Sequence, residues 1–111
     1  MRNVVVINSE TMGRGSADLG RTLIAAFLRK LAASSDRPER IIFYNAGVKL
    51  LAEGSPVLDA LDHLAGLGVD MVACGTCVEF FDLRDKMKIG RIGSMVTIVA
   101  DLMNAEKIVT I

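Results

Sequence analysis

The chain has 111 residues, 13 basic side chains balanced by 13 acidic ones, and two cysteines, Cys74 and Cys77. That length fits one compact domain, and we expect residues 1–111 to form it. A balanced charge without a basic cluster gives no electrostatic reason to bind nucleic acid or an anionic membrane surface. No apolar stretch approaches the roughly 20 residues that span a bilayer, and the first residues do not resemble a signal peptide, so we expect a cytoplasmic protein.

The first half of the chain alternates predicted strands with helices. Residues 4–7 are an unbroken β-branched run, typical of a strand buried on both faces of a parallel sheet. The loop over 10–16 contains glycines but lacks the third glycine and the lysine of phosphate-binding motifs, so we interpret it as a helix entry. The next helix repeats apolar residues every four positions, at Leu19, Leu23, Phe27 and Leu31. A second strand is predicted over 40–45.

The second half predicts a loop over 46–54, a helix from Ser55-Pro56 to Gly66, and a strand that begins at Val69 and ends at Cys74. It then predicts a helix whose first residue is Cys77, a helix over 94–104 capped by Ser94, and a strand over 107–111. Residues 89–93 are too short and glycine-rich to classify. Strands that alternate with helices predict a three-layer α/β/α domain with a parallel sheet of four to five strands. We expect the last strand beside the first, with the topological switch point near Asn8.

The most informative stretch is Cys74-Gly75-Thr76-Cys77, where a predicted strand meets a predicted helix. Thr76 and Glu79 have the spacing of a capping box, which would make Thr76 the N-cap. Amide donors and the positive end of the helix dipole favour a thiolate on Cys77. Glu79 opposes a thiolate, and no lysine or arginine lies within one helical turn. We predict a site for sulfur chemistry at the two cysteines.

Other readings of the two cysteines stay open. Cysteine is among the most buried residue types, so both thiols could be inert core residues of a non-catalytic binding or regulatory subunit. The Cys-x-x-Cys spacing also fits a thiol–disulfide redox protein, although neither proline of the chain is near it in sequence. Zinc is disfavoured because two thiolates supply half of a tetrahedral ligand set and His63 is the only histidine. We predict no metal and no cofactor.

Loop residues at the carboxyl ends of the predicted strands form a candidate binding edge. Open parallel sheets bind ligands beyond these strand ends, which all meet at one edge of the sheet. The candidate binding residues at this edge are Asn8, Ser9, Gly13, Asn45, Gly47, Lys49, Gly75 and Thr76.

The composition also bears on self-association. Hydrophobic residues make up 51% of the chain, which is high for a domain of this size with no net charge. Such a domain exposes apolar surface unless copies of it cover one another, so we expect a homo-oligomer. The apolar helix predicted after the cysteines, with Phe80, Phe81, Leu83 and Met87, is a candidate contact.

Five motifs in order resemble one family. They are Asn8-Ser9-x-Thr11-Met12-Gly13-x-Gly15, Asn45-x-Gly47-Val48-Lys49-Leu50, Glu53-Gly54-Ser55-x-Val57-Leu58, Cys74-Gly75-Thr76-Cys77 and Ala105-x-Lys107-Ile108-Val109-Thr110-Ile111. Together they resemble the DsrE/DsrF-like family, in particular the DsrE-like domain of the YedF proteins, called sulfurtransferase-like selenium metabolism proteins. The resemblance runs essentially from end to end.

The resemblance implies a three-layer sheet, symmetric oligomers, and a role in relaying sulfur, or selenium, between proteins. Relatives pass sulfur as a cysteine persulfide, and aligning the strand ends places their sulfur-accepting cysteine at Cys74, with Cys77 as a second thiol. Many YedF-type proteins also carry a TusA-like sulfur-carrier domain, so a TusA-like carrier is the expected partner. Relatives often have glycine where this chain has Asp82.

Overall fold

The computed structural model describes residues 1–111 and contains one sheet of five parallel strands. The strands are β1 (Asn3–Ile7), β2 (Arg40–Phe43), β3 (Asp70–Cys74), β4 (Arg91–Gly93) and β5 (Lys107–Thr110). They lie side by side in the order β4-β3-β2-β1-β5. This confirms the predicted parallel sheet and the place of the last strand beside the first. The additional strand, β4, comes from the stretch over 89–93 that the sequence left unclassified.

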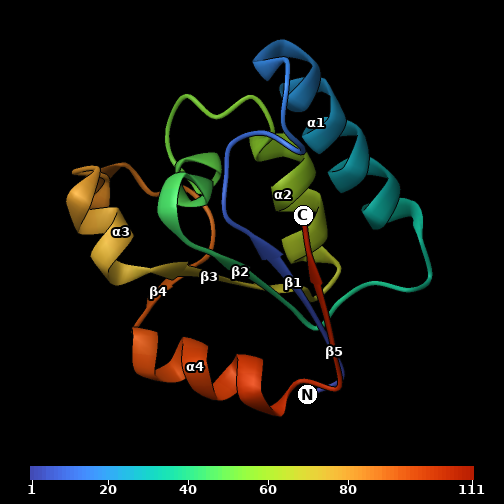
Figure 1. Ribbon diagram of the computed structural model, residues 1–111, viewed down its shortest axis with the longest axis vertical. Coiled ribbons are helices and arrows are strands. Elements are labelled where there is room, and N and C mark those ends of the chain that lie inside the picture. The colour runs from blue at the N-terminus through green and yellow to red at the C-terminus, as the bar shows by residue number, and fades with distance from the viewer.

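Helices cover both faces of the sheet, as the α/β/α prediction requires. The α-helices are α1 (Ala17–Ala33), α2 (Leu58–Gly66), α3 (Gly75–Phe80) and α4 (Met95–Asn104), and two 3-10 helices are η1 (Asn45–Leu51) and η2 (Arg84–Lys86). Figure 1 shows α1 and α2 on one face and α4 alone on the other, with α3 beyond the carboxyl ends of the strands.

The core is divided by the sheet because alternate residues of each strand point to opposite faces. Val5 and Ile7 of β1 join a cluster of 18 buried residues on the α1 and α2 side. The other cluster has five buried residues, Val4, Val6, Ile42, Cys74 and Ile98, the last of which comes from α4. Cys74 is therefore part of the smaller core, beneath α4.

The helix starts agree with the sequence patterns in part. Ser94 caps α4, since its side chain accepts from the backbone N–H of Thr97. Ser55 does not cap α2: its side chain accepts from the N–H of Val57, and the helix begins at Leu58. The sequence prediction placed this start too early because Pro56 and Val57 form a turn before the helix. The loop predicted over 46–54 was also wrong, since most of it is the helix η1.

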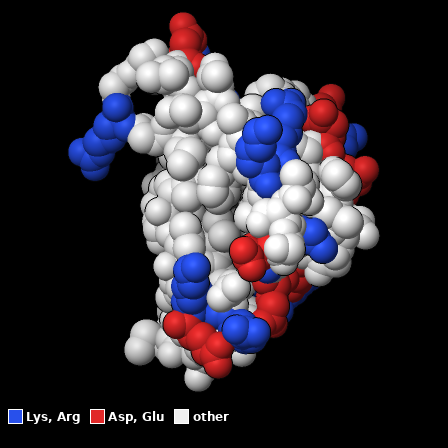
Figure 2. All heavy atoms as spheres, turned by 90° about the vertical axis from the view of Figure 1, so that its right-hand side faces the viewer, with Lys and Arg blue, Asp and Glu red and all other residues white.

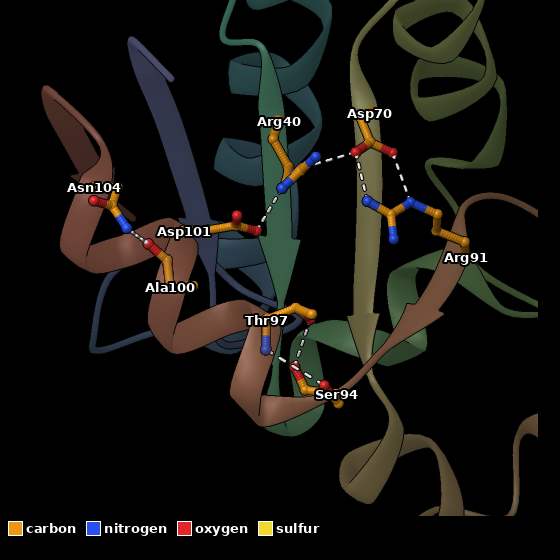
Figure 3. Close-up of polar contacts among 8 residues, drawn as sticks. All are labelled: Arg40, Asp70, Arg91, Ser94, Thr97, Ala100, Asp101 and Asn104. Atoms are coloured by element: carbon orange, nitrogen blue, oxygen red, sulfur yellow. Dashed lines mark hydrogen bonds and ion pairs between the residues drawn. The ribbon is translucent and has the colours of Figure 1, made fainter.

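A network of ion pairs connects α4 and β4 to the amino ends of strands β2 and β3 (Figure 3). Arg40 of β2 donates to Asp70 of β3 at 2.7 Å and to Asp101 of α4 at 2.5 Å. Arg91 of β4 donates to Asp70 at 2.8 and 3.1 Å. The hydrogen bonds from Arg91, and then those from Arg40, hold the pKa of the Asp70 carboxyl below its usual value.

This network predicts a specific pH dependence of stability. The pKa of Asp70 is lower in the folded chain than its unfolded value of about 3.9, so the carboxylate stabilises the fold above that pH. The contribution is lost as the pH falls through the folded pKa. Replacing Arg91 with glutamine should therefore reduce the difference in unfolding free energy between pH 7 and pH 3 by up to about 1 kcal/mol, a small effect because Arg91 is largely exposed.

Urea unfolding at the two pH values measures this difference. Arg37→Gln is the matched control, because Arg37 hydrogen-bonds a backbone carbonyl, that of Ser34, and has no acidic partner. Equal pH dependence in Arg91→Gln and the parent chain would contradict the assignment.

Candidate functional site

The two cysteines lie where β3 runs into α3 without an intervening loop. Cys74 is the last residue of β3 and Gly75 is the first residue of α3. A Cβ on Gly75 would come within 3.2 Å of the Ile92 side chain, so glycine lets the junction pack tightly against β4. Both cysteines are free, but Cys74 is 0% exposed whereas Cys77 is partly exposed. Only Cys77 is open to a reactant.

The start of α3 differs from the capping box that the sequence predicted. Cys74 occupies the N-cap position, and Thr76 lies inside the helix. The Glu79 carboxylate pairs with Arg84 instead, with 2.5 Å between Arg84 Nε and Glu79 Oε1. Because β3 leads directly into the helix, no extended residue is left at Thr76 to act as a cap.

The helix after the cysteines is also shorter than predicted. It ends at Phe80, and Asp82 adopts a positive φ of 54°, in the left-handed region that glycine enters most easily. The chain then turns back, so that the N–H of Glu53 donates to the carbonyl of Lys86 at 2.8 Å. The apolar residues after the cysteines therefore lie on a short helix and a folded-back segment that contacts the end of η1.

Cys77 lines a small open cavity of about 240 Å³ together with Asn45, Thr76, Phe80 and Phe81. The backbone N–H of Asn45 donates to Cys77 Sγ at 3.1 Å. Asn45 has a positive φ of 50°, a conformation that asparagine tolerates better than most residues. The turn that begins η1 therefore aims a backbone donor at the sulfur.

The environment of Cys77 determines its proton affinity. Burial raises the pKa of the Cys77 thiol, the Asn45 N–H acts in the opposite direction, and the neighbouring Cys74 raises the pKa further. The net pKa is above the ordinary value, so the helix start does not produce the stable thiolate that the sequence favoured. The thiol is protonated at neutral pH, and its reactivity should increase as the pH rises.

Two further candidate binding residues, Lys49 and Gly47, help to position the elements around the cavity. The ammonium nitrogen of Lys49 lies 4.4 Å from the centre of the Phe81 ring and 3.9 Å from a carboxylate oxygen of Glu10. Gly47 packs so closely on β1 that a Cβ would lie 2.2 Å from the carbonyl oxygen of Ile7. Lys49 thus contacts the Phe81 ring, which lines the cavity, and Gly47 allows η1 to pack closely against the sheet.

The remaining predicted residues lie at the same edge but do not line the cavity. The amide of Asn8 is 3.5 Å from the hydroxyl of Tyr44, and Ser9 hydrogen-bonds Thr11 within its own loop. Gly13 has a positive φ of 84° in open surroundings. This loop forms a neighbouring part of the edge, separate from the thiol.

The cavity residues that sequence reasoning missed are Phe80 and Phe81. They were interpreted as an oligomer contact because they were placed on a long amphipathic helix. The available signal was their position directly after the cysteine pair, where a short helix brings both rings close to the thiol. The structure contains no group of three or more His, Cys, Asp or Glu side chains that could hold a metal ion. None of its helices is long and apolar enough to cross a membrane.

These features define a small α/β protein with a parallel five-stranded sheet and two free cysteines at the carboxyl edge. The sequence matches no family model and no curated protein. Its fold matches YchN from E. coli with a TM-score of 0.70, at 18% identity over 100% of both chains.

Two proteins of unknown function share the same fold. MTH1491 from Methanobacterium thermoautotrophicum has a TM-score of 0.70 at 19% identity, over 96% of this chain and 97% of that one. BT1422 from Bacteroides thetaiotaomicron has a TM-score of 0.68 at 20% identity, over 98% of this chain and 94% of that one. The fold is therefore shared along almost the whole chain.

Proposed function

We propose that this protein is a sulfur-relay protein of the DsrE-like class, in which Cys77 accepts sulfur from a persulfide donor and passes it to a partner. The observation that carries the proposal is a single accessible thiol, Cys77, that lines a small cavity and receives a backbone hydrogen bond at 3.1 Å. The motif resemblance to YedF-type domains supports the same chemistry.

The proposal assigns the accepting role to Cys77 rather than to Cys74. The sequence favoured Cys74 on the argument that a thiol at a strand end can present a persulfide outward. In the structure the Cys74 side chain is 0% exposed and packs in the smaller core with Ile98. A persulfide on Cys74 would need space that this core does not have, whereas a persulfide on Cys77 would extend into the cavity.

The loading step needs only a thiolate and an accessible donor. The Cys77 thiolate attacks the outer sulfur of a donor persulfide, R–S–SH, and a new S–S bond forms at Cys77. The S–S bond of the donor breaks, and the donor leaves as a thiolate that takes up the proton released by Cys77. The Asn45 N–H donates to the sulfur before the reaction and can stabilise negative charge on it.

The unloading step repeats this exchange with a partner thiol, which attacks the outer sulfur and releases the Cys77 thiolate. A TusA-like sulfur carrier is the proposed partner, and a reducing compartment such as the cytoplasm would keep both cysteines free. Cys74 provides an alternative unloading reaction, in which its thiolate attacks the inner sulfur of the Cys77 persulfide, releases hydrosulfide and forms a Cys74–Cys77 disulfide. A cellular thiol would then reduce this disulfide.

Intact-protein mass spectrometry tests the proposal. After incubation with a low-molecular-weight persulfide donor, we expect the protein to gain the mass of one sulfur atom, and dithiothreitol should remove it. The control is the double variant Cys74→Ala/Cys77→Ala, which should gain nothing. If the parent chain gains no sulfur and neither thiol reacts with iodoacetamide in the folded state, the relay is wrong and the inert binding subunit is the better description.

A further inference from the structure

The cavity beside Cys77 has a wall that is mainly aromatic. Besides Cys77, the residues that line it are Phe80, Phe81, Thr76 and Asn45. The ring centres of Phe80 and Phe81 are 5.1 Å apart and the two ring planes are perpendicular, so the rings form an edge-to-face pair. A molecule that enters the cavity therefore meets aromatic surface next to the sulfur.

The two phenylalanines contribute differently to the fold. Phe81 packs against the larger core cluster, whereas Phe80 belongs to neither cluster. The Phe80 side chain is 81% exposed, more than any other large apolar side chain of the protein. A ring left in water forgoes the stabilisation that burial would give it. The stability of the fold therefore does not explain Phe80, whereas contact with a ligand at the thiol would.

Charged groups around the cavity are already paired. None of the five residues that line it carries a charge. Lys49 lies over the Phe81 ring, and its ammonium nitrogen is 3.9 Å from a carboxylate oxygen of Glu10. Arg84 hydrogen-bonds the carboxylate of Glu79. A donor with a charged organic group would lose water on entering the cavity without gaining an ion pair there, so the site disfavours it.

The opposite side of the molecule does not select a ligand by charge either. Figure 2 shows the side that faces away from α3 in Figure 1, and acidic and basic groups lie close together on it. Charges of mixed sign do not produce the potential of a single sign that would attract a charged ligand. The aromatic wall beside Cys77 is therefore the feature by which this protein could select a donor.

The cavity volume of about 240 Å³ limits the size of the molecule that it holds. One water molecule occupies about 30 Å³ of the liquid, so the cavity has room for about eight non-hydrogen atoms. We propose that Cys77 takes sulfur from a small organic persulfide whose carbon group is apolar and uncharged and packs against Phe80. This inference rests on the sulfur-relay function proposed above and names the class of donor for the same site.

The transfer from such a donor is balanced without any further reactant. The Cys77 thiolate attacks the outer sulfur of R–S–SH, and the S–S bond of the donor breaks. The proton that Cys77 loses is taken up by the leaving R–S⁻ group, so the products are the Cys77 persulfide and the thiol R–SH. Contact between the R group and the Phe80 ring would hold the outer sulfur close to Cys77 Sγ during the attack.

Two donors of similar size test the proposal. Benzyl persulfide has an apolar, uncharged carbon group, whereas cysteine persulfide carries an ammonium group and a carboxylate. Intact-protein mass spectrometry at low donor concentration gives a loading rate constant for each donor. The ratio of the benzyl to the cysteine rate constant is then compared between variants, which cancels the intrinsic reactivity of each donor. We expect Phe80→Ala to lower this ratio about 10-fold, because the benzyl group loses an apolar contact.

Val96→Ala is the matched control, because Val96 is apolar and 80% exposed but lies on α4, outside the cavity. It should keep the parent ratio, and circular dichroism should show that both variants are folded. An equal ratio in Phe80→Ala and the parent chain, with both donors loading Cys77, would overturn the donor class and leave the relay intact. A similar fall in Val96→Ala would overturn it too. If neither donor loads the parent chain, the relay itself is wrong.

Discussion

Replacing Cys77 with alanine is expected to lower the rate of sulfur loading at least about 100-fold, whereas Cys74→Ala should keep it within a few-fold of the parent rate. The physical reason is access, because Cys77 lines the open cavity and Cys74 is 0% exposed beneath α4. The rate in Cys74→Ala should rise with pH, since burial raises the pKa of the Cys77 thiol above its ordinary value. Mass spectrometry over time, at several pH values, measures both effects.

Iodoacetamide labelling of the folded variants provides the control for this experiment. Labelling in Cys74→Ala should follow the same pH dependence as loading, because both reactions need the Cys77 thiolate. In Cys77→Ala the remaining thiol should label only after the chain is unfolded in urea. Loading that survives Cys77→Ala and disappears in Cys74→Ala would reverse the assignment and would mean that α4 moves to expose the smaller core.

Replacing Gly47 with alanine is expected to destabilise the fold by about 3 kcal/mol or more. The new Cβ would lie 2.2 Å from the carbonyl oxygen of Ile7 and 2.9 Å from its carbonyl carbon, and backbone atoms cannot move aside as a flexible side chain can. Relief requires η1 to move away from β1, which would also displace Asn45 from Cys77. Urea unfolding measures the loss of stability.

Gly66→Ala is the matched control for this substitution. Gly66 lies in α2, and a Cβ there would meet no atom within 4 Å. Alanine favours a helix over glycine, so this variant should be stabilised by up to about 1 kcal/mol. Equal stability of Gly47→Ala and Gly66→Ala would show that η1 does not need its close contact with β1.

Local sequence patterns predicted most of the fold. The β-branched run over 4–7, the four-residue repeat from Leu19 to Leu31 and the cap at Ser94 each depend on neighbours within a few positions. The alternation of strands and helices then restricted the topology, because parallel strands joined by helices need both faces covered. For this reason the parallel sheet and the pairing of β5 with β1 could be predicted.

The structure of the thiol site depended on contacts between distant residues. The donor to Cys77 comes from Asn45, which is 32 positions earlier in the chain. Glu79 could pair with Thr76 or with Arg84, and only the turn after α3 decides for Arg84.

The sequence by itself determined the fold class, the order of the main elements and the location of both cysteines at a strand end. Only the tertiary structure decided which thiol is accessible, since the burial of Cys74 depends on Ile98 of α4 packing against the sheet. It also decided the sign of the pKa shift of Cys77, because desolvation depends on the atoms that surround a side chain in space. Local sequence patterns reflect the propensity of each segment to form a helix or a strand. Burial depends instead on residues that come into contact only when the chain has folded.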